Sequence, residues 1–248
     1  PETIDVVLGN GIVPADATNV ANRGRPTSHV AAEFLSRKLW TWFAPDTPPP
    51  SSVRGAMRDA LVGSGFEIRP VVRAMLTHDA FYSTEVKSGL VRTPTEFAVA
   101  LMYATGKRAG EADFSWLTDS MGQRLLYPPN VSGWRPNGYW VNASAMEGRA
   151  RLVQHFAWTA SRTYWQSGGT GVISLARGQL TNQQVTARVG GVAELSNEDF
   201  IRLLEEYTAI ELTATSRAEI VRYAESATVW ERNGALVLLL LAPEMHVA

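Results

Sequence analysis

The chain has 248 residues, 45% of them hydrophobic, and this length allows one large domain or two small ones. The absence of cysteine excludes disulfides and thiolate chemistry. The net charge of -1 gives no global electrostatic reason to bind nucleic acid, so we expect no nucleic-acid partner. The longest apolar run, residues 235–242, is much shorter than the ~20 residues that cross a bilayer. We expect a buried helix there and no transmembrane span.

The spacing of apolar residues, together with the proline and glycine breakers between them, predicts an all-α fold. In chain order, we expect helices over residues 29–43, 51–63, 68–78, 94–106, 111–121, 144–165 and 197–209, one that opens at Ser216, and a last one over 229–242. The alternation with period two that is typical of strands is nearly absent. The predicted architecture is an irregular multi-helix bundle with one long loop, at about residues 123–143, that is rich in proline, glycine and tryptophan.

The first predicted helix, 29–43, has apolar residues at helical spacing, which indicate its buried face. These residues are Ala31, Phe34, Leu35, Leu39, Trp42 and Phe43. Thr27 or Ser28 is suited to cap its start. Pro45 follows the helix and excludes its continuation.

The long predicted helix, 144–165, opens with the spacing of a capping box, in which Ser144 and Glu147 satisfy each other's backbone donors. Its predicted buried face consists of Met146, Ala150, Val153, Phe156, Ala157, Ala160 and Tyr164. Further along the chain, Ser196 is expected to cap the helix at 197–209, and Ser216 with Glu219 has capping-box spacing again.

Composition predicts how these helices are organised. We expect residues 1–166 to form a helical core with the long loop, 167–195 to be an irregular connector, and 196–248 to form C-terminal helices that pack on the same core. The glycines of 167–171 could wrap a phosphate, but they follow a helix and lack a lysine, which favours a linker. The first residue is Pro1 rather than methionine, and we expect the chain to be part of a longer precursor.

The segment 127–142, YPPNVSGWRPNGYWVN, cannot form a regular helix or strand. Two interpretations of its aromatic side chains stay open. In the first, the tryptophans pack on helix faces and hold the loop in place, since large aromatics usually bury most of their surface. In the second, some of the aromatics, which in the loop are Trp134, Tyr139 and Trp140, line a groove for sugar rings or a polymer. The polar contacts would come from Asn130, Asn137, Asn142 and Arg135.

Signatures of known catalytic and metal sites are missing from the sequence. His29 and Glu33 lie one helical turn apart and could face a metal ion, but no second histidine has ligand spacing. We therefore assign no metal site, no cofactor and no catalytic residue. His246 lies two residues from the end of the chain, where fraying makes precise ligation unfavourable.

Two alternative functions stay open: a hydrolase and a cofactor-binding bundle. A hydrolase would use Glu33, Glu96, Glu147 or His29 as acid and base groups. A cofactor-binding bundle would use His29 or His155 as a ligand. Carboxylates that are all paired with arginine would argue against the hydrolase.

Six segments carry a resemblance to one bacterial family, in the same order along the chain. They are HVAAEFLSRKLW at 29–40, RTPTEF at 92–97, GQ at 122–123, PPNVSGW at 128–134, WVNAS at 140–144 and LLLLAPEMH at 238–246. With these motifs the chain resembles the domain of unknown function 1800 family over nearly its whole length. Members of that family are usually longer, so the chain looks like a C-terminal half.

The resemblance implies an all-helical protein that is often exported and often encoded beside another exported protein of unknown role. It implies no established activity. The positions that match the family's motifs, or directly follow them, give the predicted binding site: Arg37, Asn130, Trp134, Trp140, Asn142 and Arg149.

The leading hypothesis is an exported or envelope-associated helical protein with a structural or binding role. Its partner would be another protein chain or an N-terminal fragment of the same precursor, and a carbohydrate or polymer ligand also fits the aromatic loop. The alternative is a hydrolase that acts on an envelope or matrix polymer with carboxylate acid and base residues.

Overall fold

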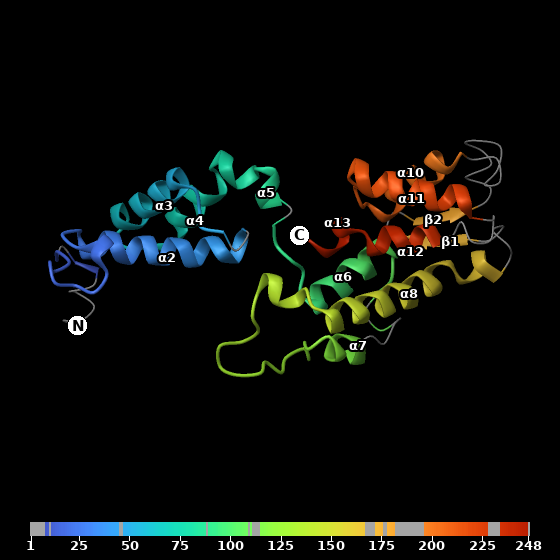
Figure 1. The fold of residues 1–248 in the computed structure, drawn as a ribbon, viewed down its shortest axis with the longest axis horizontal. Helices are drawn as coiled ribbons and strands as arrows, with labels where there is room; N and C mark the ends of the chain where they lie inside the picture. Colours follow the sequence, from blue (N-terminus) through green and yellow to red (C-terminus); the bar gives the residue numbers. More distant parts are fainter. Residues whose placement is uncertain are drawn as a thin grey trace. The chain divides into compact units, whose positions relative to one another are not determined.

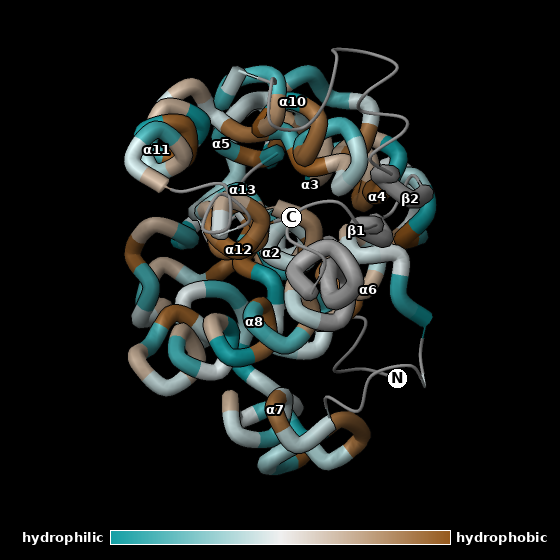
Figure 2. Tube along the Cα trace, turned by 90° about the vertical axis from the view of Figure 1, so that its right-hand side faces the viewer, coloured by the Kyte–Doolittle hydropathy of each residue, from teal (hydrophilic) through white to brown (hydrophobic). Residues whose placement is uncertain are grey.

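The computed structural model describes residues 8–9, 11–44, 47–87, 89–108, 110, 115–166, 172–175, 178–181, 196–227 and 234–247. These residues are mainly helical, which confirms the predicted all-α class (Figure 1). Figure 2 shows apolar and polar residues alternating around many of the helices, as amphipathic helices require. No helix in the described ranges is long and apolar enough to span a bilayer.

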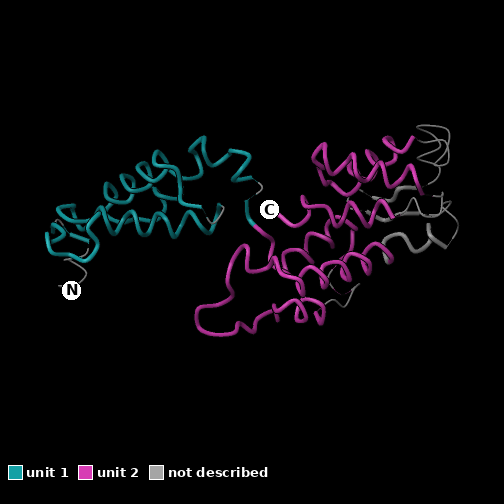
Figure 3. Tube along the Cα trace, in the orientation of Figure 1, with its two compact units in different colours: residues 1–90 teal, residues 91–248 magenta. Residues whose placement is uncertain are grey.

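The chain divides into two compact units, Pro1–Leu90 and Val91–Ala248 (Figure 3). We call them unit 1 and unit 2. The division between Leu90 and Val91 does not coincide with the predicted connector at 167–195. The predicted boundaries stay a prediction.

Three helices form the centre of unit 1: α2 (Thr27–Phe43), α3 (Ser51–Gly63) and α4 (Ile68–Leu76). Three short ones accompany them: η1 (Val20–Asn22), η2 (Asp79–Tyr82) and α5 (Thr84–Lys87). Helix α3 packs against both α2 and α4. Trp40, Met57, Leu61 and Met75 are among the buried side chains that these helices share.

The buried face predicted for α2 was wrong for its aromatic residues Phe34, Trp42 and Phe43, whereas Leu35 and Leu39 pack against the core. The residues that are buried recur every four positions: Ser28, Ala32, Ser36 and Trp40. Phe34 is exposed instead, and 77% of Trp42 is accessible to solvent. Small residues let a neighbouring helix approach closely, so the face that α3 needs is not the most hydrophobic one. The predicted cap is also absent, because α2 begins after Pro26 with no side-chain hydrogen bond.

The described residues of unit 2 contain eight helices and one hairpin. The helices are α6 (Pro94–Ala104), α7 (Ser115–Ser120), η3 (Asn137–Trp140), α8 (Ala143–Gln166), α10 (Asn197–Thr208), α11 (Ala214–Ser226), α12 (Gly234–Leu241) and α13 (Pro243–His246). Helix α12 is the most apolar and contacts α8, α10, α11 and α13 (Figures 1 and 2). Its buried residues Leu236, Leu239 and Leu240 join a core that includes Phe97, Phe156 and Phe200.

The long helix α8 has a buried face that differs from the predicted one near its start. Val153, Phe156 and Ala157 are buried as predicted, but Met146 is exposed. The predicted face also includes Ala160 and Tyr164, whose side chains lie outside the described part of the chain. The other buried positions include Ala145, Arg149 and Leu152. A charged residue on the buried face is not expected from hydrophobic periodicity, and Arg149 is therefore a special case.

Several helix caps differ from the predicted ones by a few residues. Thr93 and Glu96 form a complete capping box at α6, and Ser196 caps α10 as predicted. At α8, however, the side chain of Asn142 accepts a hydrogen bond from the backbone N–H of Ala145, so the cap is not Ser144. At α11 the cap is Thr213 rather than Ser216. In both cases the true cap is a residue that ends the preceding loop.

A short hairpin lies in the segment that was predicted as an irregular connector. Strands β1 (Val172–Leu175) and β2 (Gly178–Thr181) pair antiparallel, with Val172 opposite Thr181. Each strand has only four residues, which is too short for period-two alternation to stand out in the sequence.

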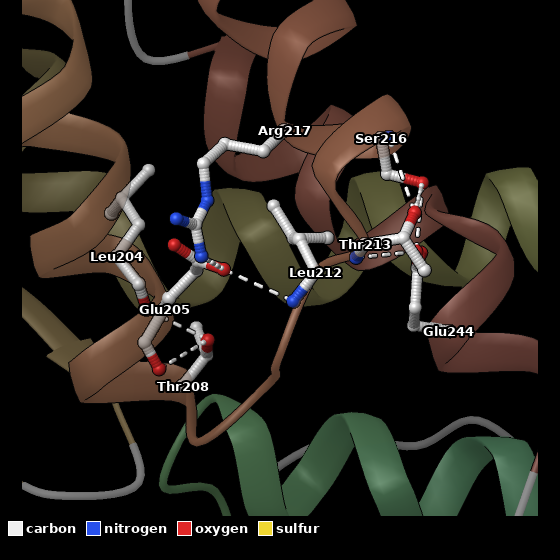
Figure 4. Close-up of polar contacts among 8 residues, drawn as sticks. All are labelled: Leu204, Glu205, Thr208, Leu212, Thr213, Ser216, Arg217 and Glu244. Atoms are coloured by element: carbon white, nitrogen blue, oxygen red, sulfur yellow. Dashed lines mark hydrogen bonds and ion pairs between the residues drawn. The ribbon is translucent and has the colours of Figure 1, made fainter. Parts of the chain in front are cut away.

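The connection from α10 to α11 is held by two carboxylates (Figure 4). The buried Glu205 accepts hydrogen bonds from the backbone N–H of Leu212, at 3.0 Å, and from Arg217, at 2.8 Å. Glu244 of α13 accepts from the backbone N–H of Thr213 and from the Ser216 hydroxyl, both at 2.8 Å. The start of α13 is thereby fixed to the N-terminus of α11.

Candidate functional site

The long loop before α8, which we call the signature loop (residues 123–142), is anchored firmly at its first residue. Gln123 is buried. Its side-chain oxygen accepts a hydrogen bond from the backbone N–H of Thr95, at 2.8 Å, and its backbone N–H donates to the Thr118 carbonyl, at 2.9 Å. Gly122 has a φ of 92°, a conformation that favours glycine, and the Trp140 ring lies against it. The loop therefore starts from a fixed point on α6 and α7.

The other end of the signature loop is anchored by a tryptophan and two asparagines. Trp140 is fully buried, with 0% of its surface accessible, and its ring meets Tyr139 edge to face at 5.1 Å. Asn137 is buried in the left-handed conformation, with a φ of 53°. Asn142 caps α8 and donates to the Tyr139 carbonyl at 3.0 Å. Trp140 and Asn142 thus hold the loop in place, as the first interpretation of the aromatics requires.

The middle of the signature loop makes a tight turn. The Asn130 side chain accepts from the backbone N–H of Ser132, at 2.8 Å, and Gly133 donates its N–H to the Asn130 carbonyl. Gly133 has a φ of 76°, which explains why a glycine stands there. Trp134, next in the chain, is half-buried. Asn130 therefore shapes the turn.

Between these anchors the signature loop exposes apolar side chains to solvent. Leu126 is 86% exposed, Tyr127 is 70% exposed and Val131 is fully exposed. Leu125, Tyr139 and Val141 are also exposed. Two arginines lie over the tyrosines: Arg124 is 4.9 Å from the ring of Tyr127 and Arg135 is 5.8 Å from that of Tyr139. Apolar, aromatic and arginine side chains on an anchored loop are the usual composition of an interface core.

Arg149 of α8 belongs to a different cluster. It is 1% exposed, and its guanidinium lies 4.7 Å from the centre of the Phe97 ring. It donates to the Arg92 carbonyl at 2.5 Å and contacts His246 Nδ1 at 3.1 Å. Burial, and then the charge of Arg92, lowers the pKa of Arg149 to about 10. Arg149 therefore stays charged at neutral pH and joins α8 to α13.

The six predicted binding residues do not share one cluster in the described part of the chain. Asn130, Trp134, Trp140 and Asn142 lie in the signature loop. Arg149 contacts Arg92, Phe97 and His246 instead. Arg37 is exposed on α2 in unit 1.

Comparison with known proteins agrees with the motifs. Residues 27–247 match the family model described as protein of unknown function (DUF1800). The chain belongs to the DUF1800 family. No match was found among curated proteins or among solved structures. The signature loop, Arg149 and His246 all lie inside the part that matches DUF1800.

The carboxylates that a hydrolase would need are occupied in this DUF1800 chain. Glu33 accepts from Arg25 at 2.5 Å and lies 3.6 Å from Arg58, and the Arg25 hydrogen bond is the main reason why the pKa of Glu33 is lowered. Glu147 pairs with Arg151 at 2.6 Å. The lowered pKa of Glu33 does not suit a general acid.

The remaining candidates are a helix cap, an exposed histidine and a segment outside the described residues. Glu96 completes the capping box of α6. The described residues contain no group of three or more histidines, cysteines or carboxylates placed to hold a metal ion. The glycine segment 167–171 lies outside the described residues. His155 is exposed on α8.

His246 is the residue that sequence reasoning missed. It was expected to fray, but its ring stacks on Phe97, with 5.0 Å between ring centres and 4° between planes. It is half-buried and contacts Arg149 and Leu241. The local signal that could have found it is Pro243, which suits the first turn of a helix and starts α13.

Two open grooves in the DUF1800 chain involve none of the predicted binding residues. One, of about 610 Å³, lies between α11 and the α12–α13 segment and is lined by residues such as Ile220, Tyr223 and Leu238. The other, of about 630 Å³, lies in unit 1 and includes Val13 and Phe34. Both are mainly apolar.

Proposed function

We propose that this DUF1800 chain is an exported binding module and that its signature loop docks a separate protein chain. The observation that carries the proposal is the exposure of Leu126, Tyr127 and Val131 on a loop fixed at both ends. Soluble proteins rarely expose large contiguous apolar patches unless the patch binds something. That the chain is exported is proposed from the family resemblance alone.

The charges of the signature loop indicate the chemistry of its partner. Residues 123–142 contain two arginines and no acidic residue. Both arginines lie beside exposed tyrosines. A partner surface with an apolar pocket and carboxylates around it would complement this arrangement. Tyrosine and arginine are also the residues that most often dominate the energetics of protein interfaces.

Fixed anchors favour binding because they reduce its entropic cost. Ordering a free loop during association consumes part of the interaction energy. Here Gln123 and Trp140 already hold the two ends, and the Asn130 turn orders the middle. Burial of one leucine or valine side chain contributes about 1.5–3 kcal/mol. Leu126 and Val131 together therefore account for a measurable share of a micromolar affinity, about 8 kcal/mol.

Site-specific crosslinking in the source organism tests this proposal. A photoreactive amino acid at position 126 is compared with the same group at Arg202, an exposed residue on α10. We expect one predominant protein adduct from position 126 and none of the same mass from position 202. The peptides of the adduct show whether the partner is a separate chain or an N-terminal fragment of the same precursor, and a fragment would contradict the separate-chain proposal.

A loop variant tests whether the exposed apolar side chains are needed for docking. Leu126→Ser with Val131→Ser should remove the adduct at a third loop position, Tyr127, without lowering the melting temperature, because neither side chain is buried. Val99→Ser, at an exposed apolar position on α6, is the matched control and should leave the adduct unchanged. Binding to anionic lipid vesicles without any protein adduct would refute a protein partner and indicate a membrane surface instead.

A further inference from the structure

The C-terminal segment of unit 2 is held by a histidine between two arginines. His246 ends α13, and its ring lies on Phe97 of α6. Arg149 of α8 contacts its Nδ1 atom at 3.1 Å, and its Nε2 atom is 3.1 Å from the Leu241 carbonyl. The ring therefore joins α6, α8 and the end of α12.

These contacts fix the protonation state of the ring. An arginine can only donate hydrogen bonds, so Nδ1 of His246 must accept from Arg149. A carbonyl can only accept, so Nε2 must carry the hydrogen and donate to Leu241. His246 is therefore the neutral Nε2–H tautomer in this arrangement.

The backbone of the same segment depends on the second arginine. The Arg92 N–H donates to the His246 carbonyl at 2.9 Å, and the Arg92 side chain donates to the Met245 carbonyl at 2.7 Å. Val91 and Val247 form an antiparallel bridge beside these bonds. Residues 245–247 are thus attached to the chain just before α6.

The charges around the ring are unbalanced. Arg149 and Arg92 face it from α8 and from the chain before α6. On α6, Glu96 is exposed and attracts Arg92, while its side chain is engaged in the helix cap. On α13 itself, Glu244 is directed to Thr213 and Ser216 of α11 (Figure 4). Among the described residues, no carboxylate forms an ion pair with His246, Arg149 or Arg92.

We propose that His246 is a pH-sensitive latch for the C-terminal segment. When the ring takes a second proton, Nδ1 changes from an acceptor to a donor and the hydrogen bond from Arg149 to the ring is lost. Three positive charges then lie together, and no carboxylate of the described residues forms an ion pair with any of them. Residues 245–247 separate from Arg92 and Arg149, while Glu244 continues to hold the start of α13 on α11.

The direction of titration agrees with this geometry. Burial, followed by the charge of Arg149, lowers the pKa of His246, and the hydrogen bond to Leu241 opposes this only in part. The folded chain therefore prefers the neutral ring. The stability that the latch contributes is present above the ordinary value of 6.5 and decreases as the pH falls below it.

The test is amide hydrogen exchange of the purified chain between pH 7.5 and 5.5, corrected for intrinsic exchange rates. The relevant amides are those of Arg92, which donates to His246, and of Met245, which donates to Ala242. We expect the protection of Arg92 to fall about tenfold or more at the lower pH, as the loss of a hydrogen bond to a charged group implies. The amide of Thr213, which donates to Glu244, should keep its protection.

His246→Gln is the decisive variant. Its side chain can accept from Arg149 and donate to Leu241, but it does not titrate, so protection at Arg92 should no longer depend on pH. His155→Gln, at an exposed histidine of α8, is the matched control and should behave like the wild type. Equal pH dependence in wild type and His246→Gln would overturn the proposal.

A spectroscopic readout keeps the proposal testable if His246→Gln does not fold. Nitrogen chemical shifts of the four histidine rings distinguish the tautomers in the wild-type chain. We expect His246 to be the neutral Nε2–H form at pH 7 and to protonate below the ordinary histidine value of 6.5. An Nδ1–H tautomer at His246, or protonation at or above that ordinary value, would overturn the assignment.

Discussion

Replacing Trp140 with alanine should destabilise unit 2 strongly. The side chain is fully buried and lies against Gly122 at the base of the signature loop. Truncating a buried tryptophan to alanine costs about 3–5 kcal/mol, from lost transfer energy and the cavity that remains. For a unit of this size, each kcal/mol lowers the melting temperature by about 2–4 °C. We therefore expect a loss of roughly 6–20 °C in a thermal melt.

Two companion variants separate packing from polar effects. The indole nitrogen of Trp140 has no hydrogen-bond partner among the described residues, so Trp140→Phe removes an unsatisfied buried donor along with some volume. It should cost much less than Trp140→Ala. Trp134→Ala should also cost less, because Trp134 is half-buried. An unchanged melting temperature for Trp140→Ala would refute the claim that this residue anchors the loop.

Two further predictions concern a cap and a carboxylate. Asn142→Ala should destabilise the chain by about 1 kcal/mol because it removes the cap of α8. Ser144→Ala should be nearly neutral. Equal losses of unfolding free energy for the two variants in urea melts would contradict the assignment of Asn142 as the cap. Burial opposes the ionisation of Glu244, but hydrogen bonds from Thr213 and Ser216 outweigh it and lower its pKa below 4.5. Its contribution to stability should therefore be present above that value and be lost as the pH falls below it. An acid titration of unfolding should show a smaller loss below pH 4.5 for Glu244→Gln than for the wild type, and identical curves would refute the assignment.

Helix positions could be predicted because their signals are local. The helix predicted at 51–63 is observed as Ser51–Gly63, between prolines and glycines that break the chain. Ser196 was recognised as a cap because the residues that it caps follow within one turn. Caps were missed where two polar residues lie close together, as Asn142 and Ser144 do. Local spacing does not distinguish which of the two has the extended backbone that a cap requires.

Contacts between distant residues could not be predicted in the same way. The face of α2 depends on the close approach of α3, which selects Ser28 and Ala32 over the larger Phe34. Arg149 is buried because Phe97, Arg92 and His246 surround it, and these residues come from both ends of unit 2. The spacing of apolar residues in α8 does not indicate those partners. For the signature loop, the sequence indicated an ordered aromatic segment but not which side chains are exposed.

The measurement that tests the central claim most directly is the native mass of the complex that contains this chain, purified from its own source. Wild type is compared with the variant that carries Leu126→Ser and Val131→Ser. The docking proposal predicts that wild type purifies with a second protein chain, and that the folded loop variant appears at the mass of the single chain. Wild type and variant at the same mass, with or without a partner, would contradict it.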